Sequence, residues 1–140
     1  MTMRRLNAAD FPQIALLLAA YKLEIGEDEP DEAALMRLEQ AISEERIQFY
    51  GCEDGASLSG MCSVCTTFST FNCRPGGVLE DFYIRPAKRH RGIARQLAAF
   101  AREQSGVSTL TVGCADCDVE LYRAIGFRER IGNLMAWNPE

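Results

Sequence analysis

The sequence has no hydrophobic run long enough to span a membrane. Its longest strongly apolar stretch, Ile14 to Ala20, is far shorter than the roughly 20 residues that a transmembrane helix needs. No signal-peptide pattern follows the N-terminus, because this stretch belongs to an amphipathic helical pattern. We therefore expect no membrane partner and a cytoplasmic location.

The chain also lacks an excess of positive charge and any strong compositional bias. Its 20 acidic residues outnumber the 15 basic ones, and such an acidic chain is a poor candidate for binding nucleic acid. The hydrophobic content of 47% excludes a disordered chain, a collagen-like fibre and a coiled coil. We expect residues 1–140 to form a single domain with a substantial core.

The charges that are present segregate along the chain. Residues 24–45 hold nine acidic residues and one basic residue, whereas residues 85–95 hold five basic residues and no acidic one. This polarity suits a cationic ligand at one place and an anionic ligand at another. Two solvated helix faces are the alternative.

Six cysteines include two Cys-x-x-Cys pairs, Cys62 with Cys65 and Cys114 with Cys117. Two such pairs can bind zinc, but these lie far apart in the sequence. Cys62 and Cys65 also fall within one predicted strand, where residues three apart point to opposite faces. We expect no metal site, and we interpret the cysteines as reduced side chains that pack as small hydrophobes.

The hydrophobic pattern predicts an α/β fold. The expected strands cover residues 3–6, 46–52, 58–71, 78–84 and 107–112, and the expected helices cover residues 10–25, 31–42, 92–104 and 119–125. Asp10 is the predicted cap of the first helix, with Gln13 as its capping-box partner. Residues 74–77 are expected to break the strand pattern, and residues 127–130 and 133–137 to close the chain as a hairpin. A strand–helix–strand unit implies one parallel pair, so we expect a mixed, mostly antiparallel sheet with helices on both faces.

The segment that carries chemical information runs from Tyr83 to Arg95. A strand leads into a basic turn and then into a helix, whose first N–H groups have no internal partner and suit a phosphate. Gly92 and Ala94 keep the approach free of side-chain bulk, and three arginines add charge. By itself the pattern also fits an ordinary basic turn on the surface.

The motif Arg89-x-x-Gly92-x-Ala94, with Leu121-Tyr122 and Gly126-Phe127 downstream, resembles the GNAT superfamily of acetyl-CoA-dependent N-acetyltransferases. The resemblance covers residues 58–137 and implies a GNAT-like fold, with acetyl-CoA as cosubstrate. The cofactor contacts that it implies fall on Phe82, Tyr83, Ile84, Arg89, His90, Arg91, Gly92, Ile93, Ala94 and Arg95. His90 stands where the loop often has glycine, and it either tunes cofactor affinity or points into solvent.

The same resemblance implies two catalytic residues. Tyr122 matches the family's tyrosine beside the cofactor sulfur, a general acid for the departing thiolate; packing of a helix face is the alternative. An amine with a pKa of about 10 must also lose a proton. Glu80 and Asp81 are the candidate bases, directly or through a water, unless they are a solvated pair at the sheet edge.

The acceptor is less defined than the reaction. The segments around Phe68 to Phe71 and Leu79 to Ile84 resemble the branch that contains diamine and thialysine acetyltransferases. That branch and the acidic turn at Glu27 favour a polyamine or a lysine-like amine, bound by Glu27, Glu80 and Asp81. A protein lysine or N-terminus remains an alternative acceptor, and a non-catalytic acyl-CoA-binding module an alternative function. Homodimers are common in the family, and the sequence leaves the assembly open.

Overall fold

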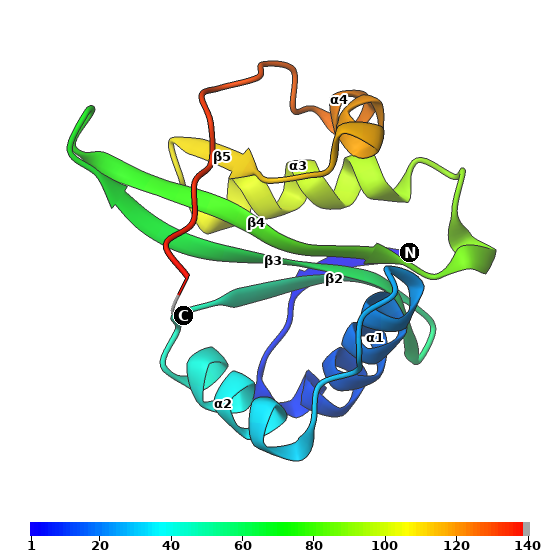
Figure 1. Ribbon diagram of the computed structural model, residues 1–140. Coiled ribbons are helices and arrows are strands. Elements are labelled where there is room, and N and C mark those ends of the chain that lie inside the picture. Colours follow the sequence, from blue (N-terminus) through cyan, green and yellow to red (C-terminus); the bar gives the residue numbers. More distant parts are fainter. Residues whose placement is uncertain (139–140) are drawn as a thin grey trace.

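The computed structural model describes residues 1–138 and contains a five-stranded mixed sheet (Figure 1). In spatial order the strands are β1 (Thr2–Arg5), β2 (Gln48–Asp54), β3 (Ser57–Ser69), β4 (Arg74–Ile84) and β5 (Thr109–Val112). The pairs from β1 to β4 are antiparallel, whereas β4 and β5 are parallel. This confirms the predicted sheet, with one parallel pair after three antiparallel ones.

Helices cover both faces of the sheet, as predicted (Figure 1). One face carries α1 (Phe11–Glu24) and α2 (Glu32–Ser43), and the other carries α3 (Ile93–Ser105) and α4 (Val119–Ile125). The sheet thus separates two hydrophobic clusters, one centred on Ile14 and Leu17 of α1 and one on Leu97 of α3. Burial of these apolar side chains is the main stabilising contribution to the fold.

The start of α1 differs from the prediction. Asn7 caps the preceding short turn, and the Asp10 carboxylate accepts from the Asn7 N–H at 2.8 Å. The same carboxylate accepts two hydrogen bonds from Arg4 of β1, at 2.7 and 2.9 Å. Gln13 accepts from the Leu58 N–H of β3 at 2.9 Å. The capping box of Asp10 and Gln13 is therefore wrong, because both side chains find partners on strands.

Residues 74–77 do not break the strand pattern, since β4 begins at Arg74 and forms a long hairpin with β3. Gly77 pairs with Thr66 in β3 and with Leu110 in β5. A Cβ atom on Gly77 would lie 3.0 Å from the side chains of Val64 and Val107. The glycine that suggested a turn is therefore needed for close packing within the sheet.

The predicted C-terminal hairpin is also wrong. Residues 127–138 contain no strand, and they cross from the α4 side of the sheet towards α2 (Figure 1). A strand register is specified when one face of the strand is buried, and here Leu134, Met135 and Trp137 are all exposed. In the described part of the chain, β5 consequently has β4 as its single strand neighbour.

Candidate active site

The two parallel strands separate part-way along their length. Pairing ends at Leu79 with Val112, yet β4 continues to Ile84. Residues 80–84, which we call the open edge of β4, thus have no strand partner on the β5 side within residues 1–138. The Ile84 carbonyl oxygen accepts from Arg89 Nε at 2.8 Å, and the other N–H and C=O groups that point outward are available to a ligand, because backbone polar groups require hydrogen-bond partners.

A β-bulge lies at the start of this open edge. In the pairing with β3, Ser63 faces Asp81 and Val64 faces Leu79, so Glu80 is the extra residue. Such bulges re-aim side chains and occur beside active sites. Here the bulge leaves the Glu80 side chain exposed, while Asp81 is buried at 8% exposure.

Ser63 fixes the position of Asp81. The Ser63 hydroxyl donates to Asp81 Oδ2 at 2.6 Å and accepts from the Asp81 N–H at 3.0 Å. Both residues are buried, where a polar group without a partner is costly. The two candidate carboxylates therefore have different environments, one held inside the sheet and one free in solvent.

Tyr21 of α1 lies on the open edge of β4, against Tyr83, with 6.2 Å between the ring centroids. Burial raises the pKa of the Tyr21 hydroxyl, and nearby carboxylates raise it further. Those carboxylates are Asp81, Glu27, Asp118 and Glu80, in decreasing order of effect. All four are close enough to act on one phenol, although they come from β4, the α1–α2 turn and the start of α4.

The structure thus places the charges of the three residues predicted to bind substrate, Glu27, Glu80 and Asp81, within range of Tyr21. It adds Tyr21 and Asp118, which the sequence analysis did not identify. Tyr21 follows the apolar spacing of its helix and is indistinguishable from a core residue in the sequence. Asp118 immediately precedes α4, where an acidic residue reads as a helix cap, but its side chain makes no capping bond.

Tyr122 of α4 belongs to the same region. Its ring meets Phe127 edge-on, with the centroids 5.9 Å apart. Burial, together with charges that include Tyr21, Asp118 and Asp81, raises the pKa of Tyr122 to about 12. The phenol is therefore protonated at neutral pH and can donate a hydrogen bond or a proton.

The turn before α3 presents unpaired N–H groups. Gly92 has φ +78° and no side-chain cap precedes the helix in the described chain. The first N–H to bond back is that of Gln96, to Gly92 O at 3.2 Å, so those of Ile93, Ala94 and Arg95 remain available. A Cβ on Gly92 would meet no atom closer than 3.9 Å. This open helix start suits an anion.

The basic side chains of this turn have different surroundings. Arg91 and Arg95 are exposed and form no ion pair within residues 1–138. Arg89 instead forms an ion pair with Glu24 of α1, at 2.6 Å. His90 is exposed and has φ +63°, a conformation more common for glycine, which agrees with its place in the motif. Two arginines thus offer free charge beside the helix start.

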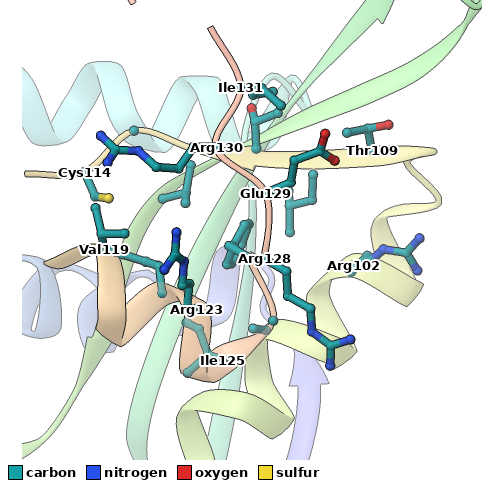
Figure 2. A pocket seen from close by; sticks show the side chains of 18 of the residues that line it. Arg102, Thr109, Cys114, Val119, Arg123, Ile125, Arg128, Glu129, Arg130 and Ile131 are labelled. Carbon is teal, nitrogen blue, oxygen red and sulfur yellow. The ribbon is translucent and has the colours of Figure 1, made fainter. Parts of the chain in front are cut away.

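A cavity of about 570 Å³ lies between α3, β5, α4 and the C-terminal segment (Figure 2). Its lining includes the five arginines Arg95, Arg102, Arg123, Arg128 and Arg130. It reaches Tyr122 but not the open edge of β4. This cavity could not be predicted from the sequence, because the C-terminal segment forms one wall and its path was predicted incorrectly.

All six cysteines are free thiols. Burial raises the pKa values of Cys62 and Cys65, so these thiols stay protonated at neutral pH. Among the residues that the structure describes, no three His, Cys, Asp or Glu side chains cluster closely enough to hold a metal ion. None of the described helices combines the length and apolar character required to cross a membrane.

Comparison with known proteins identifies the family. Residues 45–129 match the acetyltransferase (GNAT) domain. The chain belongs to the GNAT acetyltransferase family. Members of this family use acetyl-CoA, so the chain is an acetyl-CoA-dependent N-acetyltransferase. Comparison with curated proteins gives no significant match, and the family match leaves the diamine and thialysine branch unconfirmed.

Solved acetyltransferase structures share the whole fold. A probable acetyltransferase has a TM-score of 0.87 at 19% identity, over 100% of this chain and 99% of its own. An aminoglycoside acetyltransferase from an uncultured soil metagenomic sample, in complex with sisomicin, has 0.82 at 12%, over 99% and 95%. A ribosomal-protein-alanine N-acetyltransferase from Brucella melitensis biovar Abortus 2308 has 0.75 at 17%, over 99% and 100%. At these identities the likeness extends to the fold of this acetyltransferase and no further.

Proposed function

We propose that this enzyme transfers the acetyl group of acetyl-CoA to a small cationic amine, a polyamine or a lysine-like amine. The observation that supports this most is the set of carboxylates around Tyr21: Asp81, Glu27, Asp118 and Glu80. Glu80 and Asp81 belong to the open edge of β4, and Tyr21 packs against Tyr83 of the same edge. A region lined by one sign of charge attracts ligands of the opposite sign.

The residues of the chain fit acetyl-CoA. The N–H groups of Ile93, Ala94 and Arg95 precede the first backward hydrogen bond of the helix, and we assign them, with the charges of Arg91 and Arg95, to the pyrophosphate. On the β5 side Phe82, Tyr83 and Ile84 have no strand partner, and we assign the free backbone groups of this stretch to the amide-containing pantetheine arm. His90 and Gly92 contribute the left-handed backbone that turns the chain into α3.

Two side chains would transfer protons during the reaction, Glu80 as the base and Tyr122 as the acid. The bound thioester supplies an electrophilic carbonyl carbon, to which the amine nitrogen forms a bond as the carbon–sulfur bond breaks. Glu80, exposed on the bulge, accepts the amine proton directly or through a water. Tyr122 is protonated because of its raised pKa, and it donates to the sulfur as negative charge develops there. The transfer is direct, with no acyl-enzyme intermediate.

Asp81 is assigned to the acceptor. Ser63 holds this carboxylate in one orientation, on the side where Tyr21 and Tyr83 meet. An ammonium group would find there a fixed carboxylate with which it can form a charge-assisted hydrogen bond. Glu27 and Asp118 would attract a second positive charge.

The test is release of CoA from acetyl-CoA across a panel of polyamines, lysine analogues, aminoglycosides and neutral amines. We expect turnover with amines that carry two or more positive charges. Glu27→Gln should raise the KM for the amine and leave the KM for acetyl-CoA unchanged. Glu39→Gln, an equal charge change on α2, is the matched control. Preference for neutral amines would refute the proposed acceptor class, and CoA binding without any turnover would favour a protein acceptor or a binding module.

We further propose the domain organisation, the location and the partners of this enzyme. Residues 1–140 act as one acetyltransferase domain in the cytoplasm, with acetyl-CoA as cosubstrate and no metal. A small-molecule amine is the expected partner, without nucleic acid or membrane. Gel filtration at several protein concentrations would decide between a monomer and a homodimer.

A further inference from the structure

The side chain of Arg89, the first residue of the loop motif, points away from the open helix start. Its guanidinium pairs with Glu24 at 2.6 Å, and its Nε donates to the Ile84 carbonyl oxygen at 2.8 Å. It also lies over the Tyr83 ring, 5.5 Å from the centroid. The charge of Arg89 is thus used within the protein, between the last residue of α1 and the last residue of β4.

The last turn of α1 contacts this region at two points. Glu24 holds the Arg89 guanidinium, and Tyr21, three residues earlier, lies against Tyr83. Tyr83 is therefore contacted by two segments, by Tyr21 of α1 and by Arg89 of the turn before α3. One other ion pair tethers the same turn among the described residues, Lys88 with Asp54 at 2.7 Å. The position of the turn relative to α1 depends mainly on Arg89.

We propose that Glu24 and Arg89 are positioning residues, whose ion pair holds the turn so that the N–H groups of residues 93–95 meet the pyrophosphate of acetyl-CoA. This inference rests on the proposed function. When the ion pair is absent, the turn gains conformational freedom that binding must then remove. Cofactor affinity falls for this reason, although no group that touches the cofactor has changed.

A charge substitution separates this role from direct phosphate binding, because the two roles predict opposite signs. If Arg89 bound the pyrophosphate, Glu24→Gln would release its guanidinium, remove a nearby negative charge and strengthen CoA binding. If Glu24 positions the turn, Glu24→Gln weakens CoA binding. Arg89→Lys extends the test, because lysine keeps the charge but not the planar group that reaches both Glu24 and Ile84 O.

The experiment is calorimetric titration of the full chain with CoA and, separately, with pantetheine, which lacks the pyrophosphate. For Glu24→Gln and Arg89→Lys we expect the Kd for CoA to rise roughly three- to fivefold, the upper range for a partly exposed ion pair. For Glu24→Gln the Kd for pantetheine should not change, because this substitution alters no residue assigned to the pantetheine arm, and Glu39→Gln should bind both ligands like the wild type. In turnover, the KM for acetyl-CoA should rise while kcat at saturation is kept.

The outcomes are distinct. Unchanged or tighter CoA binding by Glu24→Gln overturns the positioning role. An equal loss of affinity for CoA and pantetheine also overturns it, since it indicates general damage to the fold. If the wild-type chain binds no CoA, the proposed function fails first and this inference fails with it.

Discussion

Replacing Ser63 by alanine should destabilise the protein more than an ordinary serine substitution. The Ser63 hydroxyl is fully buried and makes two hydrogen bonds, one to the carboxylate and one from the N–H of Asp81. Ser63→Ala leaves both groups of Asp81 without these partners inside the sheet. A buried polar group without its partner costs about 1–3 kcal/mol, and more when it is charged. For the pair we expect a loss of about 2–4 kcal/mol in the free energy of unfolding.

Thermal and urea unfolding would measure this loss. For a chain of this length, a loss of that size lowers Tm by roughly 10 °C. Ser59→Ala is the matched control, because Ser59 is buried in the same strand and its hydroxyl makes no hydrogen bond within residues 1–138. We expect the control to lose less than about 1 kcal/mol. Equal losses for the two variants, or a loss below about 1 kcal/mol for Ser63→Ala, would refute the argument that Asp81 depends on Ser63.

Three further predictions concern the site, an ion pair and a glycine. Tyr122→Phe should lower kcat by a factor of about 10² or more and leave the Kd for CoA unchanged. In the wild type, loss of the Tyr122 proton should not lower kcat until the pH approaches 12. A variant with the kcat of the wild type would exclude a proton-donating role for Tyr122. Hydrogen bonds from Arg4 lower the pKa of Asp10, so this pair stabilises the fold above the unfolded pKa of about 3.9 and is lost as the pH falls through the lower folded value. Urea unfolding from pH 7 downwards should show this decline in the wild type and a smaller one in Asp10→Asn; identical pH profiles would contradict it. Gly60→Ala places a Cβ 2.8 Å from the Tyr83 carbonyl oxygen, which should lower the free energy of unfolding by about 1–3 kcal/mol. A variant with the Tm of the wild type would show that β3 and β4 can move apart without cost.

Local patterns were sufficient for most of the fold. The spacing of apolar residues located four helices and five strands, and α4 covers residues 119–125 as expected. The order of strands and helices also required the parallel pair, because a crossover helix separates β4 from β5. Each of these features depends on residues close together in the sequence.

The structural features that were predicted wrongly, or not predicted, depend on contacts between residues that lie far apart in the sequence. Gln13 binds a strand 45 residues away and Glu24 binds a loop 65 residues away, and no local spacing reports such contacts. Tyr21 follows a core pattern, yet four carboxylates from three segments raise the pKa of its hydroxyl. The alternation in residues 133–137 predicts a strand only if a face of that strand is buried, and the fold leaves it exposed.

The open edge of β4 links the stability of this region to its ligand. Residues 80–84 are held on the β3 side by the hairpin, but on the β5 side by no other strand of the described chain. Amide protons on the β3 side should exchange slowly with solvent, and those on the β5 side rapidly, since exchange follows local opening. A ligand that bonds to these amides protects them and stabilises the folded state by mass action. Hydrogen exchange along β4 therefore measures how fully a ligand completes the sheet, residue by residue and without any turnover.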